Sequence, residues 1–331
     1  MSGMRIARGI RLLLEYDRGL FTTMPNENAY LFPSLRYLTS IICSVCLLAA
    51  CSSPKRQRPV PTPPAQSQVK PSRPRHGEPI NIMGLVNYFA AESKDLLQQG
   101  RVATNLLEQL GRRTCRLNLA PAPTRALAFD EMAEAVEMGV AVVGRIAKVN
   151  GRPELTPTAT GFFLTDSGAL VTCGHVVNWD KLIGLTVMTR DGRVCPVREI
   201  LAVSMDYDLA ILQVEGQGFT PLPVAPGTRA GAPVWVLGHP FPWYYMLTAG
   251  IASGYYVLNE RRDLTMLVIT AEFANGSSGA PVLNEHGAVV GVAAMRQIIG
   301  IPGTPQMPIR GCVPSSALLN MIQHEPLGEI H

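Results

Sequence analysis

Three short stretches of the sequence carry residue types that together could perform nucleophilic catalysis. In chain order, His175 follows an apolar run, Asp208 precedes the apolar residues 209–212, and Ser278 lies among glycines and small residues. A serine hydroxyl is a weak nucleophile at neutral pH, so it needs an imidazole within hydrogen-bond reach. A carboxylate must hold that imidazole in one tautomer. The stretches therefore predict acyl transfer at a serine of the third stretch, with His175 as general base and an aspartate of the second stretch as the orienting acid.

The glycines beside the serine meet a second chemical requirement. The negative charge that develops on an attacked carbonyl oxygen needs backbone N–H donors, and loss of one donor typically costs about 3–4 kcal/mol. Glycines permit the tight turn that exposes such donors. We therefore expect the N–H groups of Gly276 and Ser278 to form an oxyanion hole. A glycine-flanked serine alone is usually a turn, so only the joint occurrence of the three stretches indicates a catalytic triad.

From Val140 onward the sequence reads as short strands that could position these residues. Runs rich in β-branched residues recur about every ten residues, and turn residues separate them at 166–168, 191–192 and 284–287. Such a pattern predicts an antiparallel sandwich or barrel. His175 would then lie at a strand end, where its ring can face a cleft.

Four of these runs resemble the trypsin-like serine peptidases, closest to the HtrA/Deg type. They lie between residues 138 and 315 and read GFFLTDSGALVTCGHVV, DYDLAILQV, VLGHPFPWYYMLTAGIASG and NGSSGAPVLNEHGAVVGVAAM. The order His, Asp, Ser is also that of chymotrypsin-like enzymes. The resemblance implies a mainly β, chymotrypsin-like fold of two packed antiparallel β-barrels with the triad in the cleft between them. It also implies a serine endopeptidase that acts on polypeptides. We expect no cofactor and no metal, because no cysteine has metal-ligand spacing.

The resemblance also decides between neighbouring candidates. The reactive serine of the family directly precedes a glycine, which selects Ser278 over Ser277, and the family's acid abuts the apolar strand, which selects Asp208 over Asp206. The family usually has Asn and a second Gly where this chain has Ser277 and Ala280. Both replacements are small, so we expect activity to survive. No PDZ-like sequence follows, so cage-like assembly and peptide-regulated activation are not expected, and the oligomeric state stays open.

Other residues near these motifs receive structural interpretations. His239 lies in a Gly-His-Pro loop and His286 in a hairpin turn, while Cys173 is interpreted as a small buried strand residue rather than a nucleophile. Four cysteines follow the tether and permit up to two disulfides in an oxidising compartment, with no pairing favoured: Cys115, Cys173, Cys195 and Cys312. The alternative function is a non-catalytic, peptide-binding envelope lipoprotein that retains the protease fold.

Substrate preference has two interpretations. Alignment with the family motifs places Phe273, Met295 and Gln297 around the primary substrate pocket, which favours small or medium apolar side chains. Glu272, however, lies six residues before Ser278, the spacing at which trypsin carries its pocket acid. If Glu272 pointed into the pocket, Lys or Arg would be preferred. The apolar pocket is the favoured interpretation.

The N-terminal region has the pattern of an export signal. Residues 38–50 form an uncharged run of thirteen residues, too short to span a hydrocarbon core of about 30 Å but suited to a signal-peptide core. The run ends in Leu-Ala-Ala before Cys51, which resembles a bacterial lipobox. We therefore expect residues 1–50 to be a lipoprotein signal, with Met24 a plausible true start, and Cys51 to be lipidated. Ser52 favours an outer-membrane protein that faces the periplasm. The alternative is a buried apolar helix with an incidental cysteine.

A proline-rich tether separates this signal from the rest of the chain. Residues 51–79 contain eight prolines and cannot bury enough apolar area to fold. The formal net charge of the whole chain is +4, of which residues 1–50 carry +2 and residues 52–78 carry +5. Residues 79–331 therefore carry −3. A mildly acidic folded part argues against a nucleic-acid partner.

Between tether and peptidase domain the pattern is helical. Apolar residues at helical spacing predict two amphipathic helices within residues 80–111, followed by a linker to residue 127. The peptidase domain is predicted over 128–320, beginning with a short helix capped by Asp130, and 321–331 is a tail. The helical pair is interpreted as an accessory docked on the domain, although a segment that restrains the site, as in a zymogen, stays open.

Overall fold

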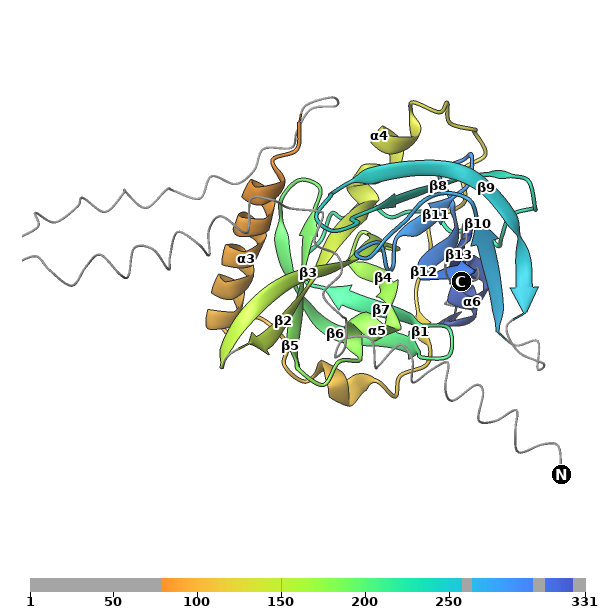
Figure 1. Cartoon of the computed structure of the whole chain (residues 1–331). Helices are drawn as coiled ribbons and strands as arrows, with labels where there is room; N and C mark the ends of the chain where they lie inside the picture. Colours follow the sequence, from red (N-terminus) through yellow and green to blue (C-terminus); the bar gives the residue numbers. More distant parts are fainter. Residues whose placement is uncertain (1–78, 150, 258–263, 300–306, 324–331) are drawn as a thin grey trace, which may run out of the picture. The chain divides into compact units, whose positions relative to one another are not determined.

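The computed structural model describes residues 79–149, 151–257, 264–299 and 307–323 (Figure 1). The predicted signal, Cys51 and nearly all of the tether lie outside the described residues, as do His76, His324 and His331. Among the described helices, none is long and apolar enough to cross a membrane.

Two closed six-stranded barrels form the body of the molecule, as the sequence predicted. The first barrel consists of β2 (Val140–Val149), β3 (Arg152–Phe163), β4 (Ala169–Cys173), β5 (Leu182–Thr189), β6 (Val194–Ser204) and β7 (Leu209–Val214). The second consists of β8 (Pro233–Gly238), β9 (Met246–Val257), β10 (Thr265–Ile269), β11 (Pro281–Leu283), β12 (Val289–Ile299) and β13 (Met307–Pro314). Neighbouring strands within each barrel pair in antiparallel fashion. Closure leaves neither sheet with a free edge.

The three predicted turns are present, and each contains a glycine in the left-handed region. Gly168, Gly192 and Gly287 have φ angles of 97°, 77° and 74°. At Gly168 the need for glycine is also steric, because a Cβ there would lie 2.4 Å from the carbonyl oxygen of Val214. These turns return the chain between the strands that the β-branched runs form.

One hydrophobic cluster joins the two barrels. It includes Val171 and Ile211 from the first barrel and Trp235 and Val292 from the second, all buried. Burial of each such side chain contributes about 1.5–3 kcal/mol relative to exposure. The shared cluster therefore fixes the barrels against each other along the junction where the predicted triad lies.

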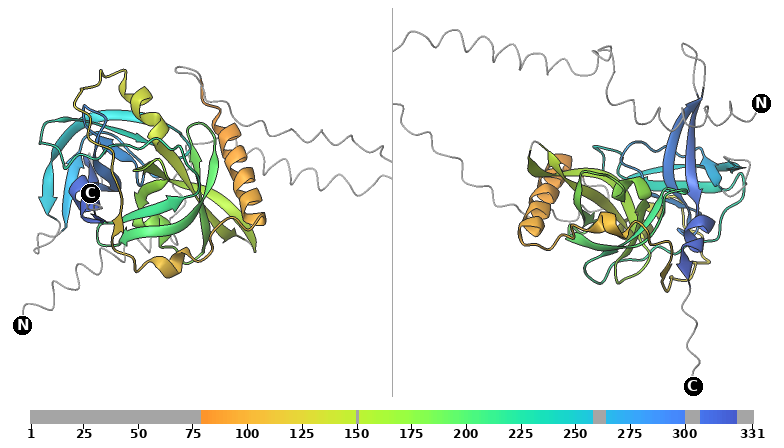
Figure 2. Two further views of the ribbon diagram at one scale, coloured as in Figure 1. Left: turned by 180° about the vertical axis from the view of Figure 1, so that it is seen from behind. Right: turned by 90° about the horizontal axis from the view of Figure 1, so that it is seen from below.

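Helix α3 (Ile82–Gln98) packs on the outside of the first barrel, against β3 and β6 (Figures 1 and 2). Asn81 caps it by accepting a hydrogen bond from the N–H of Gly84 at 2.9 Å. The helix ends just before Gly100, which adopts a φ of 68°. The first of the two predicted helices is therefore present, with Phe89 and Leu96 on its buried face.

The second predicted α-helix is wrong. In its place the chain has only a short 3₁₀ helix, η1 (Leu106–Gln109). Val102 lies over Gly184 of β5, and the buried Leu106 joins the core of the first barrel. These contacts draw the chain across the barrel surface, so tertiary packing overrides the local helical pattern.

Short elements complete the fold. They are β1 (Cys115–Arg116), α4 (Met132–Val136), η2 (Glu137–Gly139), α5 (Gly174–Val177), α6 (Ser315–Asn320) and β14 (Ile322–Gln323). Strand β1, in the stretch expected to be a linker, pairs in parallel with β14 in the expected tail. The predicted cap on Asp130 is wrong: Glu131 is the N-cap of α4, and its carboxylate accepts from the N–H of Ala128 at 2.9 Å. This hydrogen bond, with the nearby Arg125, lowers the pKa of Glu131.

Candidate active site

The ends of two paired strands bring His175 and Asp208 together. Strand β4 ends at Cys173, and His175 follows on α5, while Asp208 directly precedes β7. Because Cys173 is the register partner of Leu209, the residues just beyond these two strand ends are neighbours in space. His175 and Asp208 therefore meet although 33 residues separate them in sequence.

The Asp208 carboxylate holds the histidine at two points. Its Oδ2 lies 2.7 Å from His175 Nδ1, and its Oδ1 accepts the backbone N–H of His175 at 2.7 Å. Asp208 has a φ of 54°, a conformation that aspartate tolerates better than most residues. Since Nδ1 faces the carboxylate, Nε2 is the nitrogen left to act as a base. The rival Asp206 is an exposed residue, so the geometry favours Asp208 as the orienting acid.

Ser278 lies in the loop between β10 and β11, where the two barrels meet. Its carbonyl oxygen accepts the N–H of Thr160 on β3 at 2.9 Å, and the N–H of Gly279 donates to Ala293 on β12 at 2.8 Å. Gly279 has a φ of 87°, and a Cβ there would lie 2.3 Å from the carbonyl oxygen of Thr160. That carbonyl also accepts from the hydroxyl of Thr172, three residues before His175. The backbone around Ser278 thus packs against β3, next to β4, the strand that precedes His175.

The two predicted oxyanion donors have a suitable orientation. The carbonyl of Asn275 accepts the N–H of Phe241 at 2.9 Å, and the carbonyl of Ser277 accepts the N–H of Ala280 at 2.8 Å. In a trans peptide the N–H points opposite to the carbonyl. The N–H groups that follow these carbonyls, those of Gly276 and Ser278, therefore point away from the loop's internal hydrogen bonds and are available to an incoming oxyanion.

Only glycine fits at position 276. The residue has a φ of 99°, and a Cβ there would lie 2.4 Å from the carbonyl oxygen of His239 and 2.8 Å from the nitrogen of Phe241. Neither contact can relax by a side-chain movement, because both partners are backbone atoms. The His239–Tyr245 loop after β8 therefore packs directly on the backbone of the oxyanion turn.

Thr160 is a functional residue that the sequence reasoning missed. Its hydroxyl donates to the carbonyl of Gly276 at 2.8 Å and accepts the N–H of His239 at 3.0 Å. Together with its backbone bond to Ser278, Thr160 connects β3, the oxyanion turn and the loop after β8. The local sequence around Thr160 does not predict this role, because the two partners of its hydroxyl lie more than seventy residues away in the sequence.

His239 supports the same loop as a neutral residue. Its Nδ1 accepts the N–H of Tyr245 at 3.0 Å, and burial lowers the pKa of His239 to about 3. The ring of Tyr245 packs edge-on against it, with centroids 4.6 Å apart, and the Arg190 guanidinium lies 4.6 Å from the centroid of the Tyr245 ring. Arg190 in turn pairs with Glu137 at 2.9 Å, both side chains being mostly buried. Burial is the main reason for this lowered pKa, and the positive charge of Arg190 lowers it further, so His239 stays neutral.

Of the three residues predicted to line the primary substrate pocket, the structure describes the side chain of Phe273 alone. Phe273 is buried in the core of the second barrel. Met295 and Gln297 lie on β12, paired in register with Gly311 and Ile309, and their side chains fall outside the described part.

Glu272, the alternative pocket acid, forms an ion pair with Arg310. The carboxylate of Glu272 contacts Nη2 of Arg310, whose residue is 7% exposed, while the side chain of Glu272 is 68% exposed. Arg310 faces the same side of β13 as the buried Cys312, two residues away. The Glu272 carboxylate is therefore paired with the buried Arg310, while most of the Glu272 side chain is in contact with solvent.

The four cysteines that could have formed disulfides are free thiols. The sulfur of Cys173 lies within 4.8 Å of ligand atoms of His175 and Asp208, and it donates to the carbonyl of Ala293 at 3.5 Å. Burial raises the pKa of the Cys173 thiol well above its ordinary value. A protonated thiol beside an imidazole and a carboxylate already bonded to each other is a poor donor set for a metal ion.

Known proteins share this domain. Residues 159–292 match the family described as a trypsin-like peptidase domain. Over 159 residues the chain is 28% identical to "Serine protease HTRA2, mitochondrial" of Drosophila pseudoobscura pseudoobscura, covering 46% of this chain and 37% of that protein. The protein of the same name from Drosophila virilis is 28% identical over 159 residues, covering 46% and 38%. A solved serine endoprotease from Yersinia pestis is 20% identical, with a TM-score of 0.48 and coverage of 60% of this chain and 66% of that one.

The family match and the relatives agree on the class of protein that this part of the chain resembles. All three residues of the predicted triad lie within the matched residues 159–292. Residues 159–292 are thus similar to a trypsin-like peptidase domain, and the chain is similar to HtrA serine proteases over 159 residues. It spans well under half the length of the curated relatives that it matches.

Replacement of Thr160 by valine tests the link between β3 and the oxyanion turn. Valine keeps the branched shape but leaves the carbonyl of Gly276 and the N–H of His239 without a partner. Such a loss costs about 1–3 kcal/mol, so we expect kcat on a peptide substrate to fall about ten- to a hundredfold, with KM little changed. Thr160→Ser retains the hydroxyl and should keep most of the activity. An unchanged kcat for folded Thr160→Val would contradict this role.

Proposed function

We propose that this protein is a serine endopeptidase that hydrolyses peptide bonds through an acyl-enzyme on Ser278. The observation that carries the proposal is the bond of 2.7 Å between His175 Nδ1 and Asp208 Oδ2, at the barrel junction that also holds Ser278. The domain match supports it, because all three residues lie inside the matched region.

The proposed mechanism follows from these contacts. Ser278 Oγ attacks the carbonyl carbon of the scissile bond while His175 Nε2 takes its proton. Asp208 orients the imidazole and stabilises the imidazolium that forms. The N–H groups of Gly276 and Ser278 bind the oxyanion, and His175 then returns the proton to the leaving amine. Water, activated by the same imidazole, releases the acyl group from Ser278.

A fluorophosphonate probe tests the nucleophile directly, because it phosphonylates only an activated serine. We expect the purified protein to label at Ser278 and the Ser278→Ala variant to be unlabelled, as read by mass spectrometry of the peptide. Ser277→Ala is the matched control, since Ser277 is adjacent but buried, and it should retain the label. A folded protein that binds peptides but neither labels nor turns over would be the non-catalytic peptide-binding lipoprotein instead.

We further propose that the primary pocket takes small or medium apolar side chains rather than Lys or Arg. The ion pair between Glu272 and Arg310 supports this preference. A carboxylate that already neutralises a nearby guanidinium offers little net charge to a substrate cation. The side chain of Glu272 is also 68% exposed, and high dielectric weakens any remaining attraction.

Glu272→Gln therefore should not change selectivity. The ratio of kcat/KM for peptides with valine and with lysine before the scissile bond should shift by less than about tenfold, which is about 1.4 kcal/mol. Glu285→Gln, at a carboxylate in the 284–287 turn, is the matched control. A wild-type preference for lysine that disappears in Glu272→Gln would refute the apolar pocket.

We also propose that the protein is lipid-anchored at Cys51 and faces the periplasm, with the outer membrane favoured. The support is the sequence pattern alone: an uncharged run of thirteen residues that ends in Leu-Ala-Ala-Cys, followed by serine. Envelope polypeptides would then be its substrates. A cysteine that carries several acyl chains anchors a protein to a membrane far more strongly than one chain would.

Lipidation of Cys51 is tested in bacteria that process lipoproteins. We expect the wild-type protein to incorporate a labelled fatty acid and to fractionate with membranes, because its N-terminal cysteine carries acyl chains. Cys51→Ala should abolish both, whereas Cys46→Ala, in the same apolar run, should change neither. A wild-type protein that keeps residues 1–50 and takes up no label would refute the anchor.

A further inference from the structure

We propose that helix α3 is a positioning element for the active site: through Phe89 and Tyr244 it holds the loop after β8 against the oxyanion turn. The inference rests on the proposed peptidase function and adds that full activity depends on a segment outside the two barrels. In the alternative, residues 80–111 restrain the site and lower its activity; here α3 instead supports activity.

The first step joins α3 to the loop. Phe89 is completely buried and belongs to one hydrophobic cluster with Val142 of β2, Met188 of β5 and Tyr244 of the loop after β8. Gly144 makes room for the ring, since a Cβ there would lie 2.9 Å from Phe89 ring carbons. The cluster thus contains side chains from the helix, the first barrel and a loop of the second barrel. Displacement of Phe89 would therefore loosen the cluster that also holds Tyr244.

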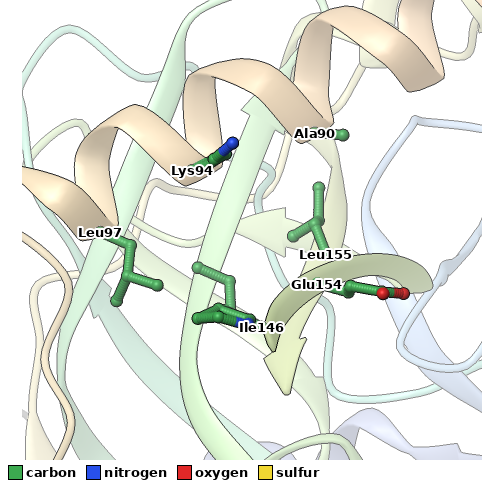
Figure 3. Close-up of a pocket in the computed structure, with 7 residues that line it drawn as sticks. Ala90, Lys94, Leu97, Ile146, Glu154 and Leu155 are labelled. Carbon is green, nitrogen blue, oxygen red and sulfur yellow. The ribbon is translucent and has the colours of Figure 1, made fainter. Parts of the chain in front are cut away.

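Polar contacts hold the helix in place around Phe89. The hydroxyl of Tyr88 donates to the carbonyl of Gly192 at 3.1 Å, and the buried hydroxyls of Ser93 and Thr186 are 2.8 Å apart. A groove of about 270 Å³ lies beside the C-terminal half of α3, next to β2 and β3 (Figure 3). Leu97, Ile146 and Leu155 line this groove.

The second step joins the loop to the catalytic backbone. The ring of Tyr244 lies 5.8 Å from that of His239, and the next residue, Tyr245, donates its N–H to His239 Nδ1 at 3.0 Å. His239 and Phe241 then contact the oxyanion turn through the backbone contacts described above. A path of packed side chains and hydrogen bonds thus runs from α3 to Gly276.

The expected consequence is kinetic. Oxyanion donors must be held close to their productive position, and an error of about 1 Å can cost about a hundredfold in rate. Loosening the loop would let the Gly276 N–H drift, which weakens binding of the transition state more than binding of the substrate. Loss of Phe89 packing should therefore appear in kcat rather than in KM.

The test compares two alanine variants of α3 in the full chain. Phe89→Ala removes the contact with the Tyr244 cluster, while Leu96→Ala removes a buried side chain of the same helix that packs in a different cluster with Val102 and Ile146. For each variant, urea unfolding gives the stability, fluorophosphonate titration gives the concentration of competent sites, and kcat and KM are measured per site. A peptide aldehyde, whose adduct with serine needs the oxyanion hole, reports transition-state binding.

We expect Phe89→Ala to lower kcat at least about tenfold, to weaken aldehyde binding by a similar factor and to leave KM within about threefold. Leu96→Ala, compared at matched folded fraction, should keep kcat within about threefold. If Phe89→Ala does not fold, Phe89→Leu and Tyr244→Ala replace it, with losses in the same two quantities.

Equal kcat values in the Phe89 and Leu96 variants would overturn the inference, because α3 would then act on stability alone. A higher kcat in Phe89→Ala would also overturn it, in favour of a restraining segment. Failure of the proposed peptidase function shows separately, as a wild-type protein that neither labels nor turns over.

Discussion

The active site depends on the contact between one strand of the first barrel and the nucleophile loop of the second. Thr160 makes this contact with its hydroxyl, which bonds to Gly276 and His239, and with its N–H, which donates to Ser278. Its carbonyl accepts from Thr172 within the first barrel. Each barrel alone holds only part of the candidate site: the first carries the histidine and the aspartate, and the second carries the serine and the two candidate oxyanion donors. Buried hydrogen bonds with several partners are costly to break, so this junction fixes the two parts relative to each other.

Different elements of the fold support the His–Asp pair and the oxyanion turn. The His–Asp pair is set by the pairing of β4 with β7, whose register brings the two strand ends together. The oxyanion turn instead rests on the loop after β8, whose buried aromatic residues pack toward α3 and the first barrel. The base and the oxyanion hole are thus supported by different elements. A change in the accessory helix can reach the oxyanion hole without disturbing the His–Asp hydrogen bond.

Local patterns predicted much of this structure, and their failures have physical causes. The strands and turns follow from β-branched runs and from glycines that later show positive φ, and the first helix follows from its apolar spacing. The second helix was wrong because Val102 and Leu106 gain more by packing on the first barrel than by continuing a helix. The cap at Asp130 was wrong because α4 begins one residue later than predicted, which puts Glu131 at the N-cap position, where its side chain makes no cap hydrogen bond.

The sequence by itself determined the fold class and predicted the candidate catalytic residues, because residue type and strand pattern are local properties. It named His175, Asp208 and Ser278, and it placed glycine at position 276, where the chain needs φ above zero. Only the tertiary structure decided what supports them. The partners of the Thr160 hydroxyl lie far away in sequence, and the ion pair between Glu272 and Arg310 depends on where the loop after β10 meets β13. Such contacts form only once both barrels close, and no local pattern encodes them.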